Sequence, residues 1–250
     1  MINKNLFLIG GTSTIGKETA LMASKLGYKV VIGYNKNELL ANEIVNTIKK
    51  SGGFCCSINI NVSDSNSVNN FFDEACSSFG LPDCFVNCSA ISPSRDYLLN
   101  ISLASIENII NVNLLGSIYA LKKAIEIMAT SRGGRGGSIV LLSSEAAKFG
   151  GNLISPYSAS KGAINSLTIG VAREIAQDGL RLNAVSPGII KDLDVLSLDS
   201  FNILNNKCSF DSIPLGRPGL PKEVSETIIW LLSDKSSYIT GTIVSVSGGR

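Results

Sequence analysis

The chain has 250 residues, of which 44% are hydrophobic and 17% are charged, and its formal net charge is +2. This size and apolar content suit one α/β domain over residues 1–250, and the mixed charges exclude a basic stripe for nucleic acid. No apolar run is long enough for a membrane helix or a signal peptide, so we expect a cytoplasmic protein. Six cysteines without a C-x-x-C pattern and the absence of histidine predict that there is no metal site and no disulfide.

The first predicted unit is a strand, a glycine turn and a helix. Residues 6–9 form a short apolar run, Gly10 and Gly11 break it, and an amphipathic stretch follows over residues 15–26. In such a turn the backbone can approach a pyrophosphate at the positive end of the helix. The same pattern also occurs as a turn without a ligand, so the turn alone leaves both interpretations open.

Strands and helices alternate along the rest of the chain. Strands are predicted at 4–9, 28–34, 53–60, 83–88, 137–143, 180–186 and 242–246. Helices are predicted at about 15–26, 38–50, 65–79, 103–131, 156–178 and 221–233. This alternation predicts a single-domain Rossmann-type α/β fold, in which helices flank a doubly wound parallel sheet of about seven strands.

Three residues in the second half of the chain indicate proton-transfer chemistry. Tyr157 and Lys161 are four residues apart, which places them on one face of the predicted helix. We expect the Lys161 ammonium to lower the pKa of the Tyr157 phenol, so that the phenol can donate and accept a proton near neutral pH. Ser144 follows the apolar run 139–142, and we expect its hydroxyl to bind the reacting oxygen.

A second pair, Tyr119 and Lys123, has the same spacing. Thirteen residues before Tyr119 stands Ile106, whereas Ser144 holds the equivalent place before Tyr157. The second pair also lies in the middle of a predicted helix, so we interpret it as structural.

These motifs resemble the short-chain dehydrogenase/reductase family along the whole chain, and in particular its 3-oxoacyl-acyl-carrier-protein reductase branch. The family's glycine loop falls on residues 9–16, its Asn-Asn-Ala-Gly segment on residues 87–90, and the turn that meets the nicotinamide on Pro187 and Gly188. The resemblance implies a catalytic group of Asn113, Ser144, Tyr157 and Lys161. It also implies cofactor contacts at Gly10, Thr12, Ser13, Thr14, Ile15, Gly16, Tyr34, Asn35, Lys36, Asn61, Val62, Asn87, Cys88, Ser89, Tyr157, Lys161, Pro187, Gly188 and Ile190.

The chain departs from the family pattern at several cofactor positions. Thr14 replaces the middle glycine of the loop, and residues 88–90 are Cys, Ser and Ala. Asn61 stands where an aspartate usually contacts the adenine, and Asp192 where a threonine usually contacts the carboxamide. None of these changes removes a proton-transfer group.

The end of the second predicted strand bears on the choice of cofactor. NAD-binding members of the family place an acid there, whereas this chain has Tyr34, followed by Asn35 and Lys36. Lys36 could pair with a 2′-phosphate, assisted by the hydroxyls of Thr12 and Ser13, so we expect NADP(H) to be preferred and keep NAD(H) as the alternative. The less favoured alternative is that Lys36 is a solvated residue that opens a helix.

The resemblance implies hydride transfer between nicotinamide C4 and a carbonyl carbon. Tyr157 would donate the proton, Ser144 would hold the oxygen, Lys161 would bind the ribose, and Asn113 would anchor a water molecule. The leading hypothesis is an NADP(H)-dependent carbonyl reductase, with 3-oxoacyl thioesters as candidate substrates. A sugar, polyol or secondary-alcohol dehydrogenase is the first alternative, and a non-catalytic nucleotide-sensing protein is the second.

The resemblance also implies partners. Residues 189–214 match the family's substrate-covering loop. An acyl-carrier protein is a candidate partner, for which Arg132, Arg135 and Arg173 could be docking cations or simply solubilising charges. A homotetramer is implied, with one interface on the helices at 103–131 and 156–178. An apolar face on the first of these helices is consistent with burial there or against the sheet, and comprises Ile109, Val112, Ile118, Leu121, Ile125 and Met128.

Overall fold

Seven parallel strands form one sheet in the computed structural model, which describes residues 3–92, 95–191 and 212–250. The strands are β1 (Asn5–Ile9), β2 (Lys29–Tyr34), β3 (Cys55–Asn59), β4 (Cys84–Asn87), β5 (Gly137–Leu142), β6 (Leu180–Pro187) and β7 (Ile243–Val246). Their order is β3-β2-β1-β4-β5-β6-β7, which confirms the predicted doubly wound sheet. The order reverses between β1 and β4, and such a reversal opens a crevice at the carboxyl ends of the strands.

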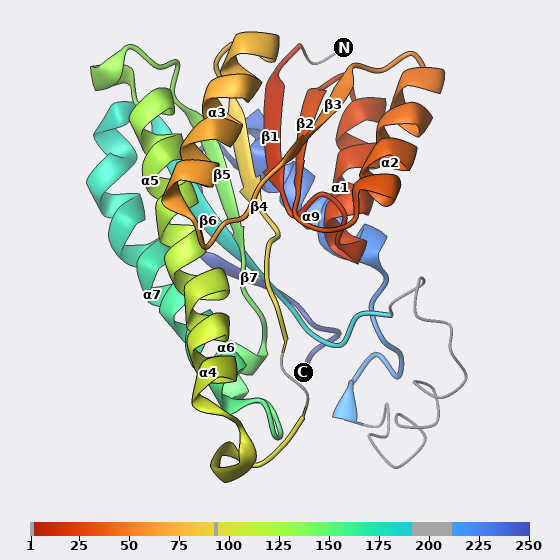
Figure 1. Ribbon diagram of the computed structural model, residues 1–250, viewed down its shortest axis with the longest axis vertical. Coiled ribbons are helices and arrows are strands. Elements are labelled where there is room, and N and C mark those ends of the chain that lie inside the picture. Colours follow the sequence, from red (N-terminus) through yellow and green to blue (C-terminus); the bar gives the residue numbers. More distant parts are fainter. Residues whose placement is uncertain (1–2, 93–94, 192–211) are drawn as a thin grey trace.

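Helices cover both faces of the sheet (Figure 1). They are α1 (Thr14–Lys25), α2 (Glu38–Lys50), α3 (Ser65–Phe79), α4 (Leu103–Ile109), α5 (Gly116–Met128), α6 (Ala146–Phe149), α7 (Ser155–Ile175) and α9 (Pro221–Leu232). Within the residues described, none of them is both long and apolar enough to cross a bilayer.

The side chains of each strand alternate between two hydrophobic cores. In β1, Phe7 and Ile9 pack with α3, α5 and α7, whereas Leu6 and Leu8 pack with α1, α2 and α9. Both faces of β1 are therefore buried, which explains its continuous apolar sequence. The alternation fixes the register of the strands and hence the position of the residue that follows each one.

The helix predicted at 103–131 is not one regular α-helix. A π-helical segment, η2 (Ile110–Leu115), separates α4 from α5, and α5 ends at Met128. Asn113 lies within η2, and its side chain bonds to the main chain of Ile91 and to Ser160. These tertiary bonds accompany the local widening of the helix, a feature that often occurs at functional sites.

The short helix α6 was not predicted. It has four residues between β5 and α7, too few for a helical period to be visible in the sequence. The strands, in contrast, lie within two residues of their predicted bounds.

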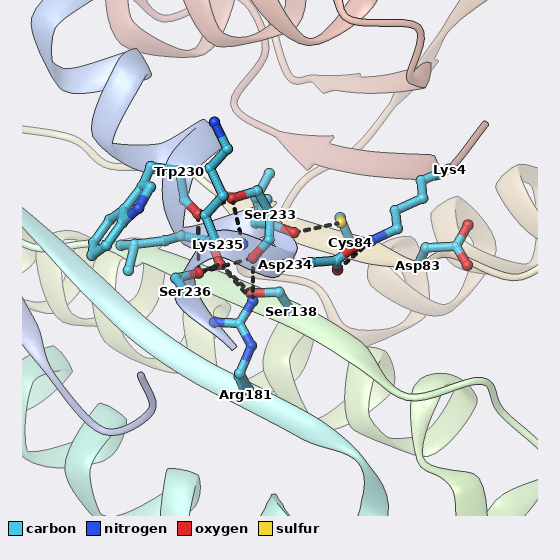
Figure 2. Close-up of polar contacts among 12 residues, drawn as sticks. Lys4, Asp83, Cys84, Ser138, Arg181, Trp230, Ser233, Asp234, Lys235 and Ser236 are labelled. Carbon is cyan, nitrogen blue, oxygen red and sulfur yellow. Dashed lines mark hydrogen bonds and ion pairs between the residues drawn. The ribbon is translucent and has the colours of Figure 1, made fainter. Parts of the chain in front are cut away.

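Polar side chains from β4, β5 and β6 bind the carbonyl end of α9 (Figure 2). Ser138 Oγ and Arg181 Nη2 each donate to the Leu231 carbonyl at 2.8 Å, and Arg181 Nη2 also donates to the Ser233 carbonyl at 3.2 Å. The last carbonyls of a helix have no partner within it, so these bonds satisfy them and place a cation at the negative end of the helix. The network fastens α9 at the amino-terminal edge of the sheet, opposite the crevice.

Candidate functional site

A cavity of about 290 Å³ lies at the carboxyl edge of the sheet, where the segments after β1, β4, β5 and β6 meet. The segments that line it belong to four separately predicted motifs. The lining residues are Ser13, Thr14, Ile15, Cys88, Ala90, Ile91, Ser92, Leu142, Tyr157, Ile190 and Lys191. The structure therefore brings the glycine turn, the β4 segment, Tyr157 and the segment after β6 to one place.

The glycine turn between β1 and α1 approaches the end of β4 closely. Gly10 has φ +76°, and a Cβ there would lie 2.6 Å from the Ser89 nitrogen. A Cβ on Gly16 would overlap the Gly10 carbonyl oxygen. Both positions thus require glycine, and the amino end of α1 faces the cavity with its first amide groups.

The hydroxyl of Ser13 is used inside the turn. It donates to the Gly10 carbonyl at 2.7 Å and accepts from the Gly16 amide at 3.1 Å, and so caps α1. To assist a 2′-phosphate, this hydroxyl would have to give up its bond to the Gly10 carbonyl, and its contact with the phosphate stays a prediction. Thr14, which replaces the family's glycine, is the first residue of α1 and lines the cavity.

Asn87 shapes the segment that follows β4. Its Nδ2 donates to Ser117 Oγ at 3.0 Å, and its Oδ1 accepts from the Ser89 amide at 2.9 Å and from Ser89 Oγ at 2.6 Å. Cys88 is buried against the cavity, and burial raises the pKa of its thiol to about 12 while the charge of Lys161 opposes the shift. The Asn87 side chain therefore holds this segment, and burial keeps the Cys88 thiol protonated at neutral pH.

Tyr157 lies in the first turn of α7 and forms a hydrogen bond with the Ser144 hydroxyl. Ser144 Oγ also accepts from the Ala146 amide at 3.2 Å. Burial raises the pKa of Tyr157, and the bond with Ser144 acts in the opposite direction. The two hydroxyls expected to hold and protonate an oxygen are thus neighbours.

Lys161 is buried one turn further along α7, with 2% of its surface exposed. Its Nζ donates to the Leu142 carbonyl at 2.6 Å and lies 5.8 Å from the centroid of the Tyr157 ring. Burial lowers the pKa of Lys161 to about 8, opposed by Cys88. We expected Lys161 to lower the pKa of Tyr157, and this was wrong: burial dominates, and the ammonium lies over the ring and bonds to the main chain.

Asn113 is fully buried and joins two parts of the site. Its Oδ1 accepts from the Ile91 amide at 2.8 Å, and its Nδ2 donates to the Ile91 carbonyl at 2.9 Å and to Ser160 Oγ at 3.1 Å. The side chain therefore ties the segment after β4 to α7. It makes tertiary bonds rather than local helical ones.

An acid in the first turn of α2, Glu38, lies beside the end of β2 and was not among the residues predicted from the sequence. The Tyr34 phenol forms a hydrogen bond with Glu38, and burial together with this carboxylate raises the pKa of Tyr34. The Asn35 carbonyl accepts from Asn59 Nδ2 at 2.8 Å, and Lys36 is exposed. Glu38 was detectable as the acid in the first turn of the predicted helix at 38–50.

The remaining predicted cofactor positions lie along the same edge of the sheet. Asn61 Oδ1 accepts from the amide and the hydroxyl of Ser63, and Val62 is buried. The Gly188 amide donates to the Val246 carbonyl at 3.0 Å, which fixes the turn after Pro187. Asp192 and most of the predicted loop at 189–214 lie outside the described residues.

The three arginines predicted as docking cations do not flank the cavity of the same chain. Arg132 and Arg135 precede β5, at the opposite edge of the sheet, and Arg135 pairs with Asp83 at 3.6 Å. Arg173 is sixteen residues beyond Tyr157 on α7, a separation of about 24 Å at 1.5 Å per residue. Arg132 and Arg135 thus lie before the start of a strand, and Arg173 lies near the far end of a helix.

Within the part of the chain that is described, no group of three or more His, Cys, Asp or Glu side chains could hold an ion. Five of the six cysteines lie within the described residues, and these five are free thiols: Cys55, Cys56, Cys76, Cys84 and Cys88.

Known proteins resemble this chain in sequence and in fold. A family profile described as Enoyl-(Acyl carrier protein) reductase matches residues 10–250. "Uncharacterized oxidoreductase YgfF" from Escherichia coli (strain K12) is 34% identical over 244 residues, which cover 96% of this chain and 97% of that protein. "3-oxoacyl-[acyl-carrier-protein] reductase FabG" from Staphylococcus aureus (strain N315) is 32% identical over 250 residues, which cover 99% of this chain and 98% of that protein.

A solved structure agrees with these sequence relatives. It is a short-chain type dehydrogenase/reductase from Mycobacterium ulcerans, with a TM-score of 0.90 and 26% identity, and the match covers 98% of this chain and 89% of that chain. The fold and the site define an oxidoreductase that uses a nicotinamide cofactor, which the close turn at Gly10 and the adjoining cavity fit. The chain belongs to the short-chain dehydrogenase/reductase family, as its motifs predicted.

Proposed function

We propose that the chain is an NADP(H)-dependent reductase that transfers hydride between nicotinamide and a carbonyl or secondary alcohol, with a 3-oxoacyl thioester as the leading substrate. One observation carries this proposal: Ser144, Tyr157 and Lys161 meet beside one cavity at the switch point of the sheet. A hydrogen-bond donor, a proton donor and a buried cation at one place are what reduction of a carbonyl requires.

Each member of this group has a distinct task in the proposed reaction. When bound, the cofactor supplies or accepts the hydride at C4 of its nicotinamide. The raised pKa of Tyr157 keeps its phenol protonated at neutral pH, which suits donation to a developing alkoxide. Ser144 orients the same oxygen, and Lys161, with a pKa of about 8, can hold the ribose and return a proton to Tyr157.

The preference for NADP(H) rests on Lys36 and is opposed by Glu38. Lys36 is an exposed cation directly after β2, where a 2′-phosphate would lie. The Glu38 carboxylate forms a hydrogen bond with the Tyr34 phenol and so lies close to the same position. We favour NADP(H) because Lys36 is nearer to the strand end, and Glu38 is the observation that supports NAD(H) as the alternative.

Exposed apolar side chains favour an acyl substrate over a sugar or polyol. They belong to the segments after β4 and β5, at the same edge as the cavity, and are Tyr97, Leu98, Leu99 and Phe149. Exposed apolar side chains in such numbers indicate contact with an apolar ligand or partner. The printed name of the Staphylococcus aureus relative, a 3-oxoacyl-[acyl-carrier-protein] reductase, supports the same substrate class.

An acyl-carrier protein is the partner that this substrate class implies. Two exposed cations lie at the carboxyl edge, Lys148 on α6 and Lys191 beside the cavity. We propose these lysines, in place of the more distant arginines, as the docking charges of the same chain.

A cofactor-oxidation screen tests the proposal. Purified chain would be mixed with NADPH or NADH and with 3-oxoacyl thioesters, simple ketones or sugars, and the reverse reaction would be run with secondary alcohols and polyols. We expect turnover of NADPH with 3-oxoacyl thioesters. Oxidation of polyols alone would favour the dehydrogenase alternative, and nucleotide binding without any turnover would leave a nucleotide-sensing protein.

A further inference from the structure

A buried carboxylate stands directly after Ser144 and has no role in the reaction described above. Glu145 is 6% exposed. Its Oε1 accepts from Ser245 Oγ at 2.6 Å, but its Oε2 is buried and has no hydrogen-bond partner among the described residues. Burying a carboxylate oxygen without a partner lowers the stability of a fold, so packing alone does not account for an acid at this position.

The main chain on both sides of Ser144 is fastened to β6. The Ser143 amide donates to the Val185 carbonyl at 2.7 Å, and the Glu145 amide donates to the Pro187 carbonyl at 3.0 Å. Pro187 ends β6 and begins the turn predicted to meet the nicotinamide. The position of Ser144 relative to that turn is therefore set by its two neighbours.

The Glu145 side chain extends this connection across β6 to the edge strand β7. Ser245 lies in β7 opposite Ser186 of β6, and it is exposed. The hydrogen bond from Ser245 to Glu145 thus links the edge of the sheet to the residue after Ser144. The side-chain bond therefore adds a third connection between the Ser144 turn and the sheet, beside the two main-chain bonds.

We propose that Glu145 is a positioning residue, whose carboxylate, held by Ser245, keeps the Ser144 turn in register with the Pro187 turn during hydride transfer. This inference rests on the proposed function. Glu145 acts through Ser144 and does not touch the substrate. Its unpartnered Oε2 lowers the stability of the fold, and the site retains this loss because the carboxylate holds the Ser144 turn in position.

Two substitutions test the proposal from opposite ends of the hydrogen bond. Glu145→Leu removes the acceptor and the unpartnered oxygen, and Ser245→Ala removes the donor. Each is expected to lower kcat about tenfold or more, because small misplacements of a catalytic group are that costly. Neither is expected to change the dissociation constant of NADPH, measured by nucleotide fluorescence, by more than about twofold, because the cofactor contacts are intact.

The melting temperature separates positioning from a purely structural role. Glu145→Leu is expected to keep or raise the melting temperature while kcat falls, because an apolar side chain of similar size replaces an unsatisfied buried acid. Glu145→Gln retains an acceptor for Ser245 and should keep kcat within about threefold of wild type. Ser247→Ala is the matched control, since its hydroxyl donates to the Arg250 carbonyl at 2.8 Å and does not contact Glu145.

Three outcomes would overturn the inference. The first is an unchanged kcat in Ser245→Ala, an exposed substitution that gives an answer even if Glu145→Leu fails to fold. The second is a fall in kcat in the double variant, Glu145→Leu with Ser245→Ala, that equals the product of the two single falls. Two substitutions that break the same hydrogen bond should have non-additive effects. The third is a fall in melting temperature with unchanged kcat. A wild-type chain that turns over no carbonyl would overturn the proposed function itself, and this inference with it.

Discussion

Lys161 places an ionisable group in the core beside the candidate site, and this has a measurable cost. Its pKa is lowered to about 8, whereas an exposed lysine has a value of 10.5. Between these values the unfolded chain holds a proton that the folded chain has released, so the free energy of unfolding rises with pH across this window. Below about pH 8 Lys161 is protonated in both the folded and the unfolded chain. The free energy of unfolding is then lowered by the full cost of burying the charged ammonium.

We therefore predict that Lys161→Met is more stable than wild type at pH 7, by on the order of 1–3 kcal/mol, even though the Leu142 carbonyl loses a donor. The difference should shrink as the pH rises from about 8 toward 10. Urea unfolding at pH 7 and at pH 10 measures it, with the exposed Lys50→Met as control. A difference that stays constant with pH would contradict the prediction.

Tyr157 is predicted to be the proton donor, and a second tyrosine provides the control. Tyr157→Phe removes one oxygen and leaves Lys161 and the glycine turn unchanged, so NADPH should still bind while kcat falls by about 10²–10⁴-fold. Tyr119→Phe should leave kcat unchanged, because Lys123, the lysine spaced like Lys161, pairs with Asp73 at 3.4 Å. Steady-state kinetics on any carbonyl found in the screen decides between the two, and full activity in Tyr157→Phe would remove the reductase assignment.

Lys36 and Glu38 are predicted to set the cofactor preference in opposite directions. Lys36→Asp should shift binding from NADPH toward NADH by about tenfold or more, because the new carboxylate repels a 2′-phosphate and can accept from ribose hydroxyls. Glu38→Gln should shift binding toward NADPH by removing a negative charge. Fluorescence titrations of both nucleotides measure these shifts, and tighter binding of NADH by the wild-type chain would refute the role given to Lys36.

At the scale of elements, α9 depends on a cation that lies outside it. Arg181 donates to the carbonyls of Leu231, Ser233 and Ile239. Arg181→Met removes these three hydrogen bonds and the cation at the negative end of α9, while Ser138, Ser236 and Asn183 still donate to the same carbonyls. We therefore predict a loss of about 1–2 kcal/mol in the free energy of unfolding. Thermal and urea unfolding measure it, with the exposed Arg173→Met as control. An unchanged stability would show that the other donors at the end of α9, such as Ser138, suffice.

The elements also show what a single sequence can and cannot predict. The strands were predictable because each is a short apolar run bounded by turn residues, and Tyr157 and Lys161 because helical spacing joins them. Asn113 was found only through the family resemblance, since its partner Ile91 lies 22 residues away. Glu145 was missed because its partner, Ser245, is 100 residues distant and no local pattern connects them.

At the scale of the whole molecule, a groove between α5 and α7 bears on assembly. Its volume is about 290 Å³, and its apolar lining consists of Ile118, Leu121, Ile125, Leu167 and Val171. The predicted apolar face of the first helix is divided. Ile109, Leu121 and Met128 are buried in the chain's own core, and Val112 packs against that core while partly buried. Ile118 and Ile125, which line the groove, remain partly exposed. The latter are the side chains that a second copy could cover.

We predict that the chain is a tetramer of 26.4 kDa subunits and that α5 and α7 form one of its interfaces. A charge in the groove, Ile125→Asp, should reduce the assembled mass at least twofold at micromolar concentration, because an unpaired carboxylate would be buried on association. Leu39→Asp, an exposed position on α2 in the opposite layer, is the control. Light scattering measures both, and a wild-type chain of monomer mass alone would reject the prediction.

The hydrogen bonds at the end of α9 lie far from the candidate site, so the stability and the substrate range of this protein can be changed at different places. Ser138 and Arg181 hold α9 at the beginning of β5 and β6, and the same two strands deliver Ser144 and Pro187 at their other ends, about 20 Å away. Substitutions that strengthen the amino-terminal edge, such as a better cap for α9, can raise heat tolerance without reaching the reacting atoms. Substitutions at the opposite, carboxyl edge can change the substrate range, and the bonds at the end of α9 offset the stability that such substitutions cost. Heat tolerance and substrate range can therefore be selected separately in the same chain.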